Sequence, residues 1–235
     1  MSALSVPSGP VSIGLPVAKA TILSYELLAR IRNAYPQIVL HVTGANSSLL
    51  RERVVNGRLD IALLFIDQPE RGLAVEPLVL EELFYVTADP DTSPVRLAEA
   101  AQRPLLVPGP GGASRRVVQE AFDKYGLTAT LVAEIDTLNT LRRAIAFGIG
   151  NAILSWSALY EGDREISLNY RRFADVKLVR PVSLCFSEVG QRSPAIEAVA
   201  LILKSLVREL VESGTWKGGA LIAHHAELSR EPAPA

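Results

Sequence analysis

The sequence has a single cysteine, three histidines and no long apolar run. One cysteine excludes a disulfide within the chain and a metal site built from cysteine pairs. Because Cys185 lies in the apolar run 182–186, we expect a buried structural thiol. No apolar run approaches the ~18 residues that a membrane span needs, so we expect no membrane partner.

An excess of charge is also missing, since 24 basic residues face 25 acidic ones and the formal net charge is -1. No dense basic stripe occurs along the chain. Affinity for nucleic acid rests largely on the neutralisation of phosphates. We therefore expect that this chain by itself does not bind duplex DNA specifically.

The patterns of secretion and of common enzymes are absent as well. The chain does not start with a basic segment followed by an apolar one, so we expect a cytoplasmic protein. It contains no nucleophile elbow and no zinc-binding helix, and the glycines at 109–112 fit neither a P-loop nor a dinucleotide turn. The pair His224 and His225 has no third ligand nearby. We expect no catalytic residue, no metal and no cofactor.

What the sequence does contain is a change of hydrophobic period at Gly57. The segment 50–56 has helical spacing, Gly57 can close a helix in the left-handed conformation, and 60–66 is a continuous apolar run typical of a strand covered on both faces. A helix that hands over to a buried strand is half of a βαβ unit. The same alternation precedes this segment and returns between residues 105 and 154, which predicts two successive doubly wound α/β units.

The stretch around Gly57 also carries a family resemblance. Asn56-Gly57-Arg58-Leu59-Asp60-Ile61-Ala62 resembles the signature of effector-binding domains of LysR-type transcription regulators. Matches in the same order flank it, at 11–14, 34–36, 77–79, 134–137, 147–154 and 193–195. The resemblance covers roughly residues 10 to 212, and the Leu15-Pro16 turn is similar to that of regulators of nitrogen assimilation and aromatic catabolism.

This resemblance implies an α/β fold of two doubly wound, Rossmann-like lobes joined by two crossing strands, as in type 2 periplasmic binding proteins. We expect the first lobe at 10–86 and 187–213, the second at 87–186, and a mobile tail at 214–235. The family also implies a homodimer of this domain, a tetramer of the full-length protein, and DNA binding only through an N-terminal domain missing here. The alternative is a solute-binding protein of a transport system, which would need an export signal.

In the family, a small-molecule effector binds in the interlobe cleft, where helix N-termini meet the carboxyl ends of strands. The expected effector contacts lie in four turns and at the end of the third strand: Pro16, Val17, Ala18, Lys19, Asn46, Ser47, Phe65, Asp136, Thr137, Leu154 and Ser155. Lys19 opposes the helix dipole unless an anion shares the site, which suggests an anionic effector, although a solvated surface lysine is the alternative. Related regulators usually have a serine or threonine in this turn.

Overall fold

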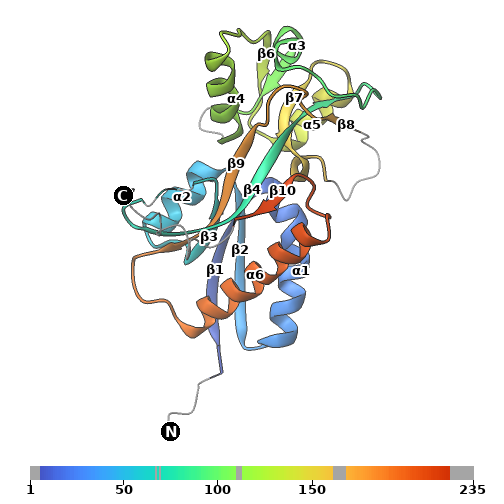
Figure 1. Ribbon diagram of the computed structural model, residues 1–235. Coiled ribbons are helices and arrows are strands. Elements are labelled where there is room, and N and C mark those ends of the chain that lie inside the picture. The colour runs from blue at the N-terminus through green and yellow to red at the C-terminus, as the bar shows by residue number, and fades with distance from the viewer. Residues whose placement is uncertain (1–5, 67, 69, 110–112, 161–167, 223–235) are drawn as a thin grey trace, which may run out of the picture.

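The structure is a computed structural model that describes residues 6–66, 68, 70–109, 113–160 and 168–222. These residues form two α/β lobes with two long strands running between them (Figure 1). The expected fold class is confirmed.

The first lobe is built on a mixed sheet with the strand order β10-β4-β9-β3-β1-β2. Strands β1, β2 and β3 are parallel, whereas β9, β4 and β10 run antiparallel to their neighbours. Helices α1 and α6 pack on one face of the sheet and α2 on the other. The elements are β1 Gly9–Pro16, α1 Val17–Ala34, β2 Ile38–Ala45, α2 Ser47–Val55, β3 Ile61–Leu64, β4 Leu73–Thr87, β9 Val179–Ser187, α6 Pro194–Glu212 and β10 Gly219–Leu221.

The second lobe uses the last part of β4, which pairs antiparallel with β7 and β8. Strands β5 and β6 form a parallel pair, and a bridge between Leu105 and Asn151 connects this pair to the segment that leads into β7. The elements are α3 Leu97–Gln102, β5 Leu105–Val107, α4 Ala113–Lys124, β6 Leu131–Glu134, α5 Leu138–Ala146, β7 Ala152–Ser155, the 3-10 turn η1 Trp156–Ala158 and β8 Asn169–Arg171.

Local sequence explains where the helices begin and end. Asn46 caps α2 by accepting the backbone N–H of Leu49 at 2.9 Å, and Gly57 follows the helix with a φ of 66°. Ser193 caps α6 by accepting the N–H of Ile196 at 3.2 Å. The end of α2 predicted just before Gly57 is confirmed. All four residues of β3 are buried, as expected for a strand covered on both faces.

The two crossing strands place the lobes relative to each other. Strand β4 pairs with β9 up to Glu82 and with the second-lobe strands from Leu83. Just before β9, the carbonyl of Leu178 accepts the backbone N–H of Leu83 at 2.8 Å. The chain therefore passes between the lobes at 82–83 and at 178–179, and β9 lies in the first sheet rather than in the second lobe to which the sequence assigned it.

The structure differs from the sequence-based prediction in two further places. The sequence pattern predicts two short strands, at 74–80 and 81–87, whereas β4 is one strand with an irregular register between Pro77 and Val79. Proline has no N–H to donate to the ladder, so a local irregularity there is sufficient and no break is needed.

The second difference is the expected tail from residue 214. Residues 214–222 return to the sheet, with Trp216 buried and β10 paired with β4. Residues 223–235, including His224 and His225, lie outside the described residues. Among the described helices, none is long and apolar enough to cross a membrane.

Candidate functional site

A cavity of about 650 Å³ lies between the lobes, and we call it the interlobe cleft. The start of α2 and the end of β3 form its first-lobe side, and α4 forms its second-lobe side. Its lining residues are Ser47, Ser48, Arg51, Leu64, Phe65, Ile66, Glu70, Arg115, Arg116, Gln119 and Glu120.

The lining of the interlobe cleft is positive, since three arginines face two glutamates. Arg51 forms an ion pair with Glu70 across the cleft floor. On α4, Arg115 bonds Glu134 at 2.6 Å, and Arg116 lies 3.9 Å from Glu120. Both lobes therefore contribute cations to one cavity.

One polar atom in the cleft lacks a partner. The hydroxyl oxygen of Ser47 is buried and, within the described part of the chain, has no hydrogen-bond partner. Ser47 is the first residue of α2, where backbone N–H groups have no carbonyl within the helix to bond. A buried hydroxyl beside a helix N-terminus is suited to hydrogen-bond an anion.

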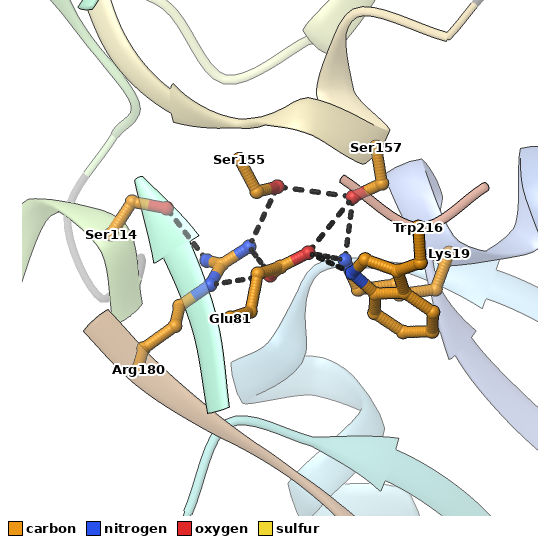
Figure 2. A network of polar contacts seen from close by, with 7 residues as sticks. All are labelled: Lys19, Glu81, Ser114, Ser155, Ser157, Arg180 and Trp216. Carbon is orange, nitrogen blue, oxygen red and sulfur yellow. Dashed lines mark hydrogen bonds and ion pairs between the residues drawn. The ribbon is translucent and has the colours of Figure 1, made fainter. Parts of the chain in front are cut away.

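Behind the cleft lies a second group of polar side chains, which we call the buried ion network (Figure 2). It consists of Lys19, Glu81, Ser114, Ser155, Ser157, Arg180 and Trp216. Lys19 and Glu81 are completely buried and Arg180 is 6% exposed.

Glu81 is at the centre of the buried ion network. One carboxylate oxygen accepts from Lys19 Nζ and, at 3.1 Å, from the indole N–H of Trp216. The other oxygen accepts from both Nε and Nη2 of Arg180, at 3.0 and 2.9 Å. Further donors of the two cations reach hydroxyl groups of the second lobe, namely those of Ser114, Ser155 and Ser157.

Two buried cations share this single carboxylate, and the pKa values reflect the imbalance. Burial lowers the pKa of Lys19 from 10.5 to about 8, because Glu81 offsets only part of the lost hydration and Arg180 adds a second positive charge. Burial alone would raise the pKa of Glu81, but the charges of Lys19 and Arg180 outweigh it and hold that pKa below its ordinary value. Glu81 is therefore ionised at neutral pH, and the network carries a net positive charge when Lys19 is protonated.

Phe65 joins the interlobe cleft to the buried ion network. Its side chain lines the cleft, and the guanidinium carbon of Arg180 lies 3.7 Å from the centre of its ring. An aromatic face this close to a buried guanidinium makes a cation–π contact. One wall of the cleft is thus backed by a positive charge.

The eleven residues expected to bind an effector do not meet in one place. Ser47 and Phe65 line the interlobe cleft, whereas Lys19 and Ser155 belong to the buried ion network. Asn46 caps α2, and Leu154 is 3% exposed in the core of the second lobe.

Three of the other five expected residues lie where β1 meets α1, and two lie just before α5. Pro16 ends β1, Val17 is 47% exposed, and Ala18 packs against apolar residues of the second lobe. Thr137 donates to the hydroxyl of Thr140 at 2.6 Å, and Asp136 is exposed beside the backbone of Gly109.

Lys19 differs most from the expectation, because it is neither solvated nor free to face a ligand. A signal for its burial is present in the sequence. Lys19 lies one helical turn before Leu23, Leu27 and Ile31, which recur every four residues and are all buried. Its position on this apolar stripe indicates a buried amine, and a buried amine requires a partner.

The arginines of the cleft and also Glu81, Arg180 and Trp216 are not among the residues expected from the sequence. Glu81 stands in the apolar segment 78–84, and a carboxylate inside a buried strand indicates a nearby cation. For Arg51, Arg115 and Arg116 the sequence offers no such signal, since each lies among other charged residues of an amphipathic helix. Among the described residues, no group of histidine, cysteine, aspartate and glutamate side chains is arranged to hold a metal ion.

Known proteins resemble this chain in sequence and in fold. The nitrogen assimilation regulatory protein nac of Klebsiella aerogenes is 33% identical over 201 residues, covering 85% of this chain and 66% of that protein. This chain thus spans about two thirds of the length of that relative.

Two solved structures share the fold at low sequence identity. The Synechocystis PCC6803 CcmR regulatory domain in complex with 2-PG has a TM-score of 0.76 at 18% identity, covering 86% of this chain and 99% of that chain. The effector binding domain of QuiR in complex with shikimate has a TM-score of 0.76 at 13% identity, covering 86% and 98%.

The family model described as the LysR substrate binding domain matches residues 5–208, which is most of the chain. This match does not favour a solute-binding protein of a transport system. The chain belongs to the LysR substrate-binding-domain family.

Proposed function

We propose that this chain is the ligand-sensing domain of a LysR-type transcriptional regulator and that it binds a small anionic metabolite in the interlobe cleft. The observation that carries the proposal is the cleft itself, about 650 Å³ in volume and lined by arginines from both lobes. Cavities of this size suit small ligands, and a few placed polar groups among apolar walls give them specificity. No catalytic step is part of this proposal.

The chemistry of the cleft favours an anion. The N-terminus of α2 presents backbone N–H groups and the positive end of the helix dipole, and the unpartnered hydroxyl of Ser47 adds a donor. Arg116 of α4 is 3.9 Å from its acidic neighbour Glu120, so its charge is available to a ligand. We retain Ser47 and Phe65 as effector contacts and add Arg51, Arg115 and Arg116, whereas Lys19 does not supply the counter-charge.

A ligand held in this way would act on the angle between the lobes. Ser47 and Arg51 belong to the first lobe, and Arg115 and Arg116 belong to the second. A ligand that contacts both sets binds the closed arrangement more tightly than an open one, and so shifts the population toward it. In the whole regulator, this shift would reach DNA through an N-terminal domain, in the cytoplasm and within a homo-oligomer.

A thermal-shift screen of small organic acids, each paired with its neutral amide, tests the proposal. A ligand that binds only the folded chain raises the free energy of unfolding by about 2.7 kcal/mol at a hundredfold excess over Kd. We expect acids to raise Tm and their amides to leave it unchanged. Equal stabilisation by acids and amides would contradict an anion site.

Variants locate the site. Ser47→Ala and Arg116→Gln should each weaken the binding of a stabilising acid about tenfold, the range of one lost hydrogen bond to a charged group. Arg32→Gln serves as the matched control, because Arg32 is exposed near the end of α1 and does not line the cleft. If all three variants bind the acid as the parent chain does, the ligand does not occupy the interlobe cleft.

A further inference from the structure

The buried ion network spans the junction of the lobes (Figure 2). Lys19, at the start of α1 in the first lobe, donates to the hydroxyl of Ser157 in the second lobe at 2.5 Å. Arg180, on the crossing strand β9, donates to the second-lobe hydroxyls of Ser114 at 2.6 Å and Ser155 at 3.1 Å. Both cations also bond Glu81 on the other crossing strand, so one carboxylate connects the two contacts between lobes.

The charge of the buried ion network is not compensated from outside it. The charges that act on Lys19 are those of Glu81 and Arg180. Several other charged side chains near Lys19 are paired elsewhere or lie over a tyrosine ring, Arg32, Arg208 and Glu212 are exposed, and η1 and β7 carry no charged residue. These contacts are Glu82 with Arg172, Arg115 with Glu134, Glu26 and Glu209 with Arg30, Lys204 with Glu76, and Lys217 over the ring of Tyr170. Removal of one proton from Lys19 would leave a neutral pair of Glu81 and Arg180.

We propose that Lys19, Glu81 and Arg180 form a proton-linked latch between the lobes, in which the charge on Lys19 determines how firmly the start of α1 is held to Ser157. When Lys19 is protonated, its ammonium group has three donors and makes charge-assisted bonds to Glu81 and Ser157. When Lys19 is neutral, these bonds weaken, whereas the two hydrogen bonds from Arg180 to Glu81 are kept. The latch then loosens on the α1 side only.

Lys19 changes its charge close to cellular pH, since its pKa is about 8.

Trp216 can report this titration by its fluorescence. Its ring centre lies 4.4 Å from Lys19 Nζ, and its indole N–H donates to Glu81 at 3.1 Å. The chain has one other tryptophan, Trp156, so Trp156→Phe leaves Trp216 as the only fluorophore of its kind.

The first experiment is a fluorescence titration of the Trp156→Phe chain between pH 6 and pH 10. We expect a transition of Trp216 emission with a midpoint near pH 8. The transition should be absent when Lys19→Met is added, because methionine keeps the length of the side chain without the amine. A flat titration in the presence of Lys19, or an equal transition with Lys19→Met, would overturn the latch.

The second experiment measures the distance between the lobes. Glu52→Cys on α2 and Lys124→Cys on α4 place spin labels on two exposed positions of different lobes. The parent chain is the control, because its single thiol, Cys185, is completely buried. We expect a narrow distance distribution at pH 6.5 that broadens at pH 9.5, and no such change with Lys19→Met.

An unchanged distribution between the two pH values would show that the charge on Lys19 does not govern the lobes. Broadening that persists with Lys19→Met would assign the effect to another group and overturn the proposal as well. Both experiments use the ligand-free chain, so their outcome is independent of whether the interlobe cleft binds an anion.

Discussion

At the scale of single residues, Glu81 is the side chain on which the buried ion network depends. It is completely buried and accepts hydrogen bonds from Lys19, Arg180, Ser157 and Trp216. Loss of this carboxylate leaves two buried cations without a counter-charge. Loss of Lys19 leaves a neutral pair, so the two partners of this ion pair are not equivalent.

This asymmetry predicts that substitutions of Glu81 and Lys19 change the free energy of unfolding by different amounts. Glu81→Gln should lower the free energy of unfolding by about 3–5 kcal/mol, the usual cost of removing one partner from a buried ion pair. Lys19→Met should change it by less than about 1 kcal/mol, or raise it, since an apolar side chain replaces a buried amine. Urea unfolding at pH 7 measures both. Equal losses for the two variants would contradict the excess of positive charge in the network.

The lowered pKa of Lys19 also predicts how stability depends on pH. Between pH 8 and pH 10.5 the unfolded chain keeps the Lys19 proton while the folded chain loses it. The free energy of unfolding therefore rises with pH through this window, by on the order of 3 kcal/mol in total, and is constant with respect to Lys19 below pH 8. The latch can loosen while the fold becomes more stable. The desolvation of the charged amine costs more free energy than its hydrogen bonds contribute.

The difference in unfolding free energy between the parent chain and Lys19→Met isolates this contribution from other titrating groups. As the pH rises from 7.5 to 9.5, we expect the unfolding free energy of the parent chain to increase relative to that of the Lys19→Met chain. A difference that stays constant over this range would mean that the pKa of Lys19 is close to its ordinary value.

At the scale of elements, the return of the chain after α6 completes the first sheet. Trp216 is 1% exposed, and β10 pairs with β4 beside the point where β4 crosses between the lobes. Gly218 makes this return possible, because its φ is 74° and a Cβ atom there would lie 2.7 Å from the ring of Phe84. Residues 213–222 are thus a structural part of the lobe junction.

We therefore predict that a chain ending at Glu212 is much less stable than one ending at Ile222. Removal of the segment deletes a buried tryptophan, for which truncation alone costs about 3–5 kcal/mol, and exposes one edge of β4. Thermal unfolding of the two chains, with Trp216→Ala as a third, measures the effect. If the chain ending at Glu212 unfolds at the same temperature as the chain ending at Ile222, the segment does not stabilise the junction.

At the scale of the whole molecule, apolar side chains are exposed on the outer edges of both lobes. Tyr25 on α1 and Val39 on β2 are 83% and 69% exposed in the first lobe. Leu131 and Val132 on β6 are about half exposed in the second lobe. Exposed apolar side chains near free sheet edges are typical of interaction surfaces. We expect the homodimer that the family resemblance implies to be a side-by-side pair, with the first lobe of one chain against the second lobe of the other.

We predict that Tyr25→Lys combined with Val132→Lys weakens self-association by at least tenfold. Each lysine places a charge in the expected interface, where it would have to be desolvated. Leu201→Lys is the matched control, because Leu201 is 63% exposed and lies on α6 rather than on α1 or β6. Sedimentation velocity over a range of concentrations gives the dissociation constants. A parent chain that stays monomeric at high concentration would rule out this dimer.

Features that depend on neighbouring residues follow directly from the amino-acid sequence. Asn46, Gly57 and Ser193 specify helix ends through bonds that reach only a few residues along the chain. The apolar run at 61–64 specifies a strand buried on both faces. Together with the family signature around Gly57, these local patterns were sufficient for the two-lobed fold and the family.

The tertiary structure alone decided which polar groups meet. Lys19 and Glu81 are 62 residues apart along the chain, and Glu81 and Arg180 are 99 apart, so their contact depends on the register of β4 against β9 and on the position of α1. The same holds for Ser47 and Arg116, which share a cleft only because the crossing strands hold α2 opposite α4. Caps and turns arise from short-range bonds, whereas an ion pair between distant residues forms only after the sheet has fixed their distance.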